Sequence, residues 1–239
     1  MKLILGAVIA TSLILFIGIL VISPVFFPKE NKAQVMLSFN ILDDTNLPNW
    51  CNELSNFLNS QNIKGTIFIT GRLSEKYPSC VTSFPKSFDV GSQTYDYVDL
   101  TEISDYSKQL EQVQKGKVAV DKSGNLDSKI FKAPFGKTDK NIYSLLGSND
   151  IRADFSYENQ YNKYYDSKFL KFDILTYDSK YHSAESLKNI ESSDKPIQIE
   201  FDNSMSVEDI KKYLEVMHGW KIKFVTASEM TNMKLTIRN

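Results

Sequence analysis

Strand-type and helix-type patterns alternate along most of this chain of 239 residues, and this alternation constrains the fold more than any other feature of the sequence. Residues 35–39 form a short apolar run of the kind found in buried strands. Residues 43–46 supply helix-capping side chains, and the apolar stripe of an amphipathic helix follows over residues 50–58. Residues 64–71 form a second strand that closes on a glycine. A strand–helix–strand unit of this length predicts parallel strands.

The alternation continues through the rest of the chain. Further strands are predicted at residues 88–91, 129–132, 151–155, 171–175, 196–202 and 223–226, and further helices at residues 100–118, 140–146 and 207–218. Roughly seven or eight strands alternating with helices predict an α/β barrel or an open doubly wound sheet, without a second domain. The hydrophobic share of 42% and the charged share of 24% are typical of a globular chain. A net charge of -1 argues against a nucleic-acid partner.

The N-terminal segment has a different character. Residues 3–27 contain no charged side chain and only three polar ones. About 20 apolar residues in a helix span a bilayer, whereas a signal peptide has an apolar region of about 7–15 residues. We therefore predict an uncleaved transmembrane anchor over residues 1–27, followed by a polar linker over residues 28–34. Lysines on both sides of the anchor leave its orientation open.

Cysteine and histidine are scarce in this chain. Cys51 and Cys80 do not belong to a C-x-x-C pair, which argues against a zinc ribbon. They form a disulfide in an oxidising compartment and stay thiols in a cytosol, and the sequence leaves both possibilities open. His182 and His218 lie far apart and away from the motifs described below, which favours ordinary surface or capping roles. Residues 156–170 are rich in tyrosine and form either an aromatic platform for sugar rings or a partly exposed loop.

Several segments, in order, share the frame of known motifs. Residues 37–40, LSFN, stand where a family strand ends T-F-D-D-G, and residues 64–71, KGTIFITG, are close to K-A-T-F-F-V-T-G. Residues 91–100, GSQTYDYVDL, keep the frame of G-N-H-[ST]-x-x-H-P-x-L, and residues 131–136, FKAPFG, that of F-R-x-P-[YF]-G. IQIEFD at residues 197–202 and KFVTASE at residues 223–229 follow I-x-L-L-H-D and K-F-V-T-x-S-E. By these motifs the chain resembles the polysaccharide deacetylase family, or NodB homology domain.

The resemblance implies a distorted (β/α) barrel of about seven strands over residues 35–232, with a short tail at residues 233–239. Family members usually act outside the cell, and many carry a membrane anchor. The resemblance therefore implies a single-pass protein of the cell membrane, with its soluble domain outside the cytoplasm. Active members hold a divalent metal, commonly zinc, through one aspartate and two histidines. A second aspartate accepts the proton and a late histidine returns it.

Other residue types occupy these positions here. The resemblance places the base aspartate on Asn40, its supporting arginine on Lys132 and the late histidine on Phe201. The metal-ligand positions fall on Ile41, Gln93 and Tyr97. A catalytic zinc needs three protein ligands and one open position. We therefore expect no bound metal and no catalytic residue, which is the pattern of a pseudoenzyme.

Two alternatives would restore an acid or a base. Asp43 and Asp44 either form a displaced carboxylate pair or cap the following helix. Glu200 takes the place of Phe201 as an acid only if the alignment slips by one residue. The regular apolar alternation of residues 197–201 argues against that slip, because it would reverse the faces of the strand.

We predict a pocket that binds a cell-envelope glycan or protein partner without a cofactor. The residues expected to form it are Asn40, Gln93, Tyr97, Pro134, Phe135 and Gly136. Amides and a phenol hydrogen-bond sugar hydroxyls, and aromatic rings stack on sugars. Two other functions stay open. One is an active hydrolase of non-peptide carbon–nitrogen bonds that deacetylates a polysaccharide, with zinc or another divalent metal in a rearranged site. The other is a structural subunit of a membrane assembly.

Overall fold

The computed structural model describes residues 32–156, 170–171 and 174–231. The chain divides into two units, Met1–Asn31 and Lys32–Asn239, and all described residues belong to the second unit. The predicted membrane anchor, most of the linker, residues 157–169 of the tyrosine-rich segment and the predicted tail lie outside the described residues. In the described part of the chain, no helix is long and apolar enough to cross a membrane.

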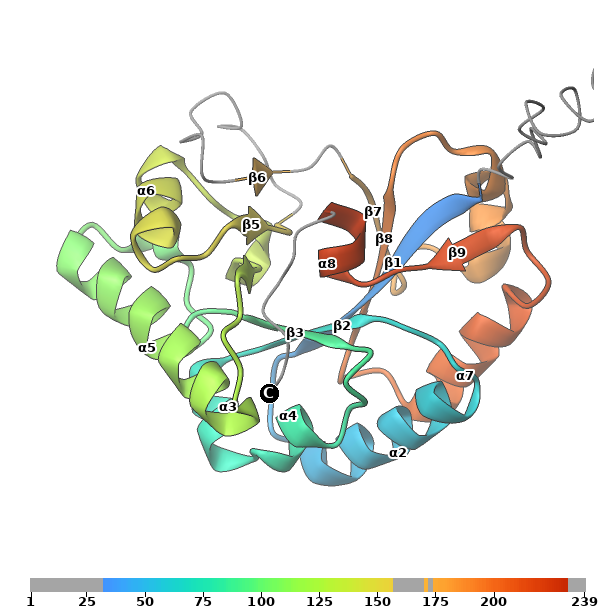
Figure 1. The fold of residues 1–239 in the computed structure, drawn as a ribbon, viewed down its shortest axis with the longest axis horizontal. Helices are drawn as coiled ribbons and strands as arrows, with labels where there is room; N and C mark the ends of the chain where they lie inside the picture. Colours follow the sequence, from blue (N-terminus) through green and yellow to red (C-terminus); the bar gives the residue numbers. More distant parts are fainter. Residues whose placement is uncertain (1–31, 157–169, 172–173, 232–239) are drawn as a thin grey trace, which may run out of the picture. The chain divides into compact units, whose positions relative to one another are not determined.

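Within the described residues, nine strands form one sheet in which all neighbouring strands are parallel (Figure 1). The strands are β1 (Ala33–Ile41), β2 (Thr66–Ile69), β3 (Asp89–Ser92), β4 (Ile130–Phe131), β5 (Ala153–Asp154), β6 (Leu170–Lys171), β7 (Leu175–Asp178), β8 (Ile197–Asp202) and β9 (Ile222–Phe224). The order across the sheet is β6-β5-β4-β3-β2-β1-β8-β7, and β9 pairs with the start of β1. This curled parallel sheet agrees with the expected α/β architecture. The nine strands are one more than the eight predicted segments, because β6 and β7 lie where a single strand over residues 171–175 was predicted.

Helices connect most of these strands. They are α2 (Leu47–Ser60), α3 (Gly71–Lys76), α4 (Ser79–Thr82), α5 (Tyr106–Gly124), α6 (Lys140–Ser148), α7 (Val207–Val216) and α8 (Ala227–Thr231), with 3-10 turns η1 (Leu100–Glu102), η2 (Pro134–Gly136) and η4 (Ala184–Ser192). The helices predicted from apolar periodicity correspond to α2, α5, α6 and α7. The short helices α3, α4 and α8 were not predicted, because four to six residues are too few to show a helical period.

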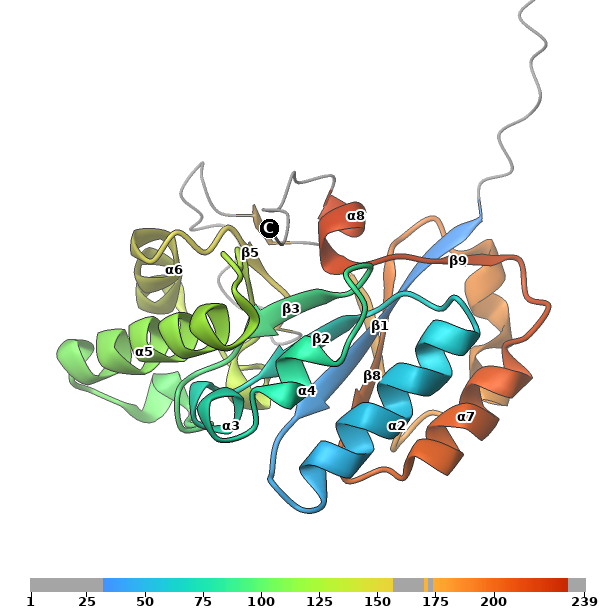
Figure 2. The same cartoon turned by 60° about the horizontal axis from the view of Figure 1, so that its bottom comes forward.

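Alternate residues of β1 face the helices. Val35, Leu37, Phe39 and Ile41 are completely buried in a core cluster that also contains apolar side chains of α2 and α7. Figures 1 and 2 show α2, α3, α4, α5 and α7 on this outer side of the sheet. Full burial of each large aliphatic side chain contributes about 1.5–3 kcal/mol, so this face fixes the register of the central strand.

The inner face of the sheet changes character along the strands. Met36, Phe68 and Ile130 on this face belong to a separate core cluster with α8 residues. The amide nitrogen of Ala227 in α8 donates a 2.9 Å hydrogen bond to Thr66 Oγ1, which ties this helix to the sheet. Near the strand ends the same face carries polar side chains. Carboxyl ends of parallel strands are where α/β proteins place their sites.

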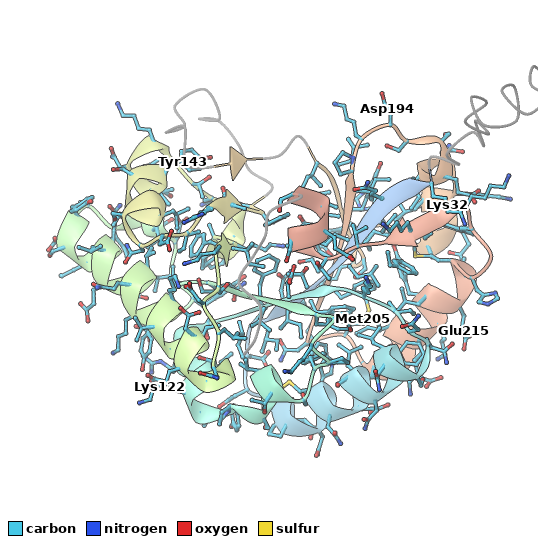
Figure 3. The ribbon with its side chains drawn as sticks, in the orientation of Figure 1. Lys32, Lys122, Tyr143, Asp194, Met205 and Glu215 are labelled. Atoms are coloured by element: carbon cyan, nitrogen blue, oxygen red, sulfur yellow. A yellow bond between two sulfur atoms is a disulfide. The ribbon has the colours of Figure 1, made fainter. Side chains whose placement is uncertain are left out.

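One disulfide joins two of the outer helices. Cys51 of α2 and Cys80 of α4 are bonded, with a Cα–Cα distance of 5.2 Å that is normal for such a bridge (Figure 3). Both side chains are buried. Of the two possibilities left open by the sequence, the structure therefore has the disulfide.

Candidate functional site

A pocket of about 90 Å³ lies at the carboxyl ends of the strands. Among the described residues it is lined by Asn40, Leu42, Gln93, Tyr97, Lys132, Ala133, Phe135, Gly136, Asp178, Glu200, Phe201 and Asp202. These residues follow five different strands, so the fold brings together side chains that are distant in sequence. Of the residues expected to form the pocket, only Pro134 is not in its lining, and Pro134 is buried. The volume is enough for several water molecules, so a larger ligand must extend to the rim.

Asn40 reaches the pocket from the end of β1. Its side chain is 7% exposed, and its Oδ1 atom is buried without a hydrogen-bond partner. The neighbouring Ile41 belongs to the outer core cluster and is completely buried. Position 41 therefore carries an apolar side chain that packs away from the pocket, and it offers no ligand atom to a metal.

On β8, Glu200 rather than Phe201 presents a functional group on the inner face. The Phe201 ring stacks on Phe39 at 5.4 Å and contacts Tyr213 edge-on at 5.1 Å, both on the helical side of the sheet. The predicted alternation of the strand is thus present, and it places the carboxylate of Glu200 inside. The resemblance placed the late histidine position on Phe201. Successive side chains of a strand point to opposite faces of the sheet, so Phe201 faces the helices and Glu200 is the acid that faces the pocket.

Glu200 forms a buried ion pair with Lys132. The lysine ammonium contacts Glu200 Oε1, and the two side chains are 4% and 7% exposed. Gln198 Nε2 donates to the same carboxylate oxygen. Burial lowers the pKa of Lys132, and the negative charge of Glu200 acts in the opposite direction. The ion pair therefore holds both side chains in place, and Glu200 Oε1 already accepts hydrogen bonds from Lys132 and Gln198.

Gln93 enters the pocket from the loop that follows β3. It is 1% exposed, and its Oε1 atom has no hydrogen-bond partner. Its backbone nitrogen donates to Ile69 O at 3.1 Å, which continues the β2–β3 pairing. A Cβ atom on Gly116 of α5 would lie 2.6 Å from Gln93 O. Only a glycine at this helix position therefore allows the loop to sit where it does.

A polar network anchors the next turn of this loop to α3 and α5. Asp96 Oδ1 accepts a 2.7 Å hydrogen bond from Arg72 Nε, and Asp96 Oδ2 accepts one of 2.8 Å from Gln112 Nε2. Gln112 Oε1 in turn accepts from the Asp96 backbone nitrogen at 2.9 Å. Partial burial by itself would raise the pKa of Asp96, but the hydrogen bonds from Gln112 and Arg72 bring it below its ordinary value. The network holds the residue immediately before Tyr97.

Two aromatic residues border the pocket with unusual backbones. Tyr97 has φ 56° and Phe135 has φ 58°, in the left-handed region that bulky residues rarely adopt. Their ring centroids are 5.2 Å apart, and Phe135 is 50% exposed. An ion pair of 2.9 Å between Lys137 and Asp99 joins the two loops beside them. Backbone strain of this kind costs about 1–3 kcal/mol per residue and is typical of binding sites.

The opposite side of the pocket is acidic, and the sequence did not indicate it. Asp178, at the end of β7, and Asp202, at the end of β8, both line the pocket. Lys180 Nζ lies 2.6 Å from Asp202 Oδ2. Burial by itself would raise the pKa of Asp202, but hydrogen bonds from Lys180 and Ser204 lower it overall, so this carboxylate stays charged at neutral pH. The predicted strand at residues 171–175 ended too early to place Asp178 at a strand end.

Asp43 and Asp44 are not part of the pocket lining. Asp43 Oδ1 accepts from the Thr45 nitrogen at 2.9 Å, and Asp44 pairs with Lys76 at the surface. The cap position of α2 is Asn46, whose side chain makes no capping hydrogen bond. The structure thus contradicts a role of either aspartate as the direct cap of α2, and it places both outside the lining that a displaced catalytic pair would need.

The residues present do not form a metal site of the family type. In the described part of the chain there is no group of three or more histidine, cysteine, aspartate or glutamate side chains placed to hold an ion. His182 is half-buried, with Nδ1 3.1 Å from the Asp178 carbonyl, and His218 is exposed. The three ligand positions hold an isoleucine, an amide and a phenol, and two of the three pocket carboxylates are paired with lysines. This donor set does not fit a catalytic zinc.

The described residues thus form a curled parallel sheet with a polar pocket at the carboxyl ends of its strands. The polysaccharide deacetylase family model matches residues 28–153, more than half of the chain, and the chain belongs to this family. A search of curated proteins found no match.

Solved structures show the same fold. Peptidoglycan deacetylase PdaC from Bacillus subtilis is 15% identical, with a TM-score of 0.62 over 85% of this chain and 92% of that chain. A family 4 carbohydrate esterase from Streptomyces lividans is 15% identical, with a TM-score of 0.59 over 82% of this chain and 92% of that chain. BA3943 from Bacillus anthracis, described as a CE4 family pseudoenzyme, is 14% identical, with a TM-score of 0.62 over 84% of this chain and 66% of that chain.

Proposed function

We propose that this protein is a membrane-anchored, extracytoplasmic member of the polysaccharide deacetylase family that no longer hydrolyses its ligand and instead binds a cell-envelope glycan. One observation carries the proposal. Where the reaction needs a base and a metal ligand, the pocket holds the amides of Asn40 and Gln93, with buried oxygens that have no partner. Buried polar atoms left without a partner in a pocket are suited to a ligand or ordered water.

Two of the three acidic groups in the pocket lining are poor substitutes for the lost chemistry. Glu200 is held by Lys132 and Gln198, and Asp202 by Lys180. A general base must be free to accept a proton at the reacting atom, and metal-ion catalysis supplies several kcal/mol of charge stabilisation that these pairs do not replace. The similarity of the fold to a protein described as a pseudoenzyme supports this interpretation.

The aromatic border supports glycan binding. The Tyr97 and Phe135 rings lie next to each other in the pocket lining, and Phe135 exposes half of its surface. Flat rings stack on the apolar faces of sugars, and rigid aromatic anchors lose little entropy on binding.

Two features support an anchored, extracytoplasmic location. Residues 3–27 have the length and apolarity of a membrane span. The disulfide between Cys51 and Cys80 is of the kind that persists in oxidising compartments.

The test uses the full chain in detergent. Binding to an envelope polysaccharide is measured for the wild type, for Gln93→Ala and for Gln114→Ala, a matched change on an exposed position of α5. We expect binding that falls at least about tenfold in Gln93→Ala only. Substoichiometric zinc and no acetate release from chitooligosaccharides are expected in parallel. No affinity for any envelope polymer, together with co-purification of a stoichiometric protein partner, would instead favour a structural subunit.

An active hydrolase with a rearranged site is the second candidate, favoured by the position of the Glu200 carboxylate inside the pocket. Sustained acetate release that disappears in Glu200→Gln, while the variant keeps its melting temperature, would establish that candidate and reject ours.

A further inference from the structure

Two side chains that line the pocket carry hydrogen-bond acceptors without a partner. Among the described residues that line it, the buried side-chain atoms without a hydrogen-bond partner are Asn40 Oδ1 and Gln93 Oε1, both amide carbonyl oxygens. The side chains are 7% and 1% exposed, so solvent does not easily satisfy these oxygens. A carbonyl oxygen can only accept, so the ligand atoms that pair with these two oxygens are donors.

The charge of the pocket favours a cation. Three carboxylates, Asp178, Glu200 and Asp202, line it together with one ammonium, that of Lys132. Lys180 pairs with Asp202 at the edge, which still leaves one carboxylate in excess over the lysines. Asp178 accepts a hydrogen bond from the Lys180 backbone nitrogen at 2.9 Å, which orients the carboxylate, and its charge also interacts with Lys132 and Lys180.

From these two observations we propose that the pocket selects the protonated primary amine of a de-N-acetylated amino sugar over the acetamido group of an N-acetylated one. The proposal rests on the glycan-binding function above and specifies which form of the glycan is recognised. The protein would then bind the product of deacetylation in preference to the substrate of deacetylation.

The donor and acceptor patterns of the two groups explain the selection. An ammonium has three donors, no acceptor and a positive charge, so Asn40, Gln93 and Asp178 can all face it favourably. An acetamido group has one donor, and its carbonyl oxygen would face the same acceptor oxygens. Leaving that carbonyl and the protein oxygens unpaired costs about 1–3 kcal/mol for each buried group. The aromatic pair Tyr97 and Phe135 favours a sugar as the carrier of the amine over a flexible aliphatic chain.

The experiment compares chitotetraose in its fully de-N-acetylated and fully N-acetylated forms, at equal ionic strength, by calorimetry on the full chain in detergent. We expect the amine form to bind at least about tenfold more tightly. Equal or tighter binding of the N-acetylated form would overturn this inference and leave the proposed glycan binding intact. Binding of neither form, nor of any other envelope glycan, would contradict the proposed function itself.

Variants separate recognition from overall charge. Asp178→Asn should reduce the preference for the amine form severalfold without changing the melting temperature. Asp194→Asn makes the same charge change on an exposed residue before the start of β8, at the end away from the pocket, and should leave the preference unchanged (Figure 3). An equal effect of both variants would show non-specific attraction and reject the site. Tight binding of tetralysine but not of the amine tetrasaccharide would reject the sugar as carrier.

Discussion

The Cys51–Cys80 disulfide should contribute a large part of the stability of this domain. It closes a loop with a sequence separation of 29 residues between α2 and α4. In the chain-entropy model, removing a cross-link of this span restores about 3.5 kcal/mol of conformational free energy to the unfolded chain. For a domain of this size, such a change corresponds to a fall of about 7–14 °C in melting temperature.

The assay is thermal unfolding with and without a reducing agent, applied to the wild type and to a Cys51→Ser, Cys80→Ser double variant. We expect the reductant to lower the melting temperature of the wild type and to leave the double variant unchanged. Both cysteines are buried, so the variant also changes packing, and the effect of the reductant within each protein is the decisive comparison. A wild type that melts at the same temperature when fully reduced would refute the reasoning.

Three further outcomes follow from the site. Gly116→Ala should lower stability by about 1–3 kcal/mol and weaken glycan binding, whereas Gly147→Ala, where an added Cβ meets nothing within 4 Å, should be harmless in urea unfolding. Lys132→Met should cost about 3–5 kcal/mol by stranding a buried carboxylate, and adding Glu200→Gln should recover part of it; a fully stable single variant would contradict the buried pair. Because the pKa of Asp96 lies below its ordinary value of 3.8 in the folded protein, its contribution is present above that pH and is lost as pH falls through the lowered pKa. Asp96→Asn should therefore melt below the wild type near neutral pH, with the difference shrinking in acid, and a constant difference would contradict this.

Much of the fold was predictable because apolar periodicity reports which face of an element is buried. The apolar run of residues 35–39 and the alternation of residues 197–201 predicted two strands, and in the structure β1 and β8 pair and each packs one face in a core. The motif order predicted the family, and the family model matches it. The short helices α3, α4 and α8 carry too few residues for a helical period to show.

The sequence predicted most of the residues that line the pocket, but not which side chains of the last strands face it. Motif spacing brought Asn40, Gln93, Tyr97 and Phe135 to one pocket, as the structure also does. It could not reveal the acidic side formed by Asp178, because that residue belongs to no recognised motif. The comparison of residues 197–202 with the family motif also could not show that Glu200 faces the pocket, because the packing of the neighbouring side chains determines which face of the strand is buried against the helices.

The position of Ile41 has a consequence for how such a site can change over evolutionary time. Its side chain is completely enclosed by the hydrophobic residues that hold the central strand in register. An aspartate introduced there would place a charge in an apolar interior, at a cost of several kcal/mol, before it could approach any ion. A metal ligand at position 41 therefore requires more than a single exchange, because the end of the strand must first be rebuilt.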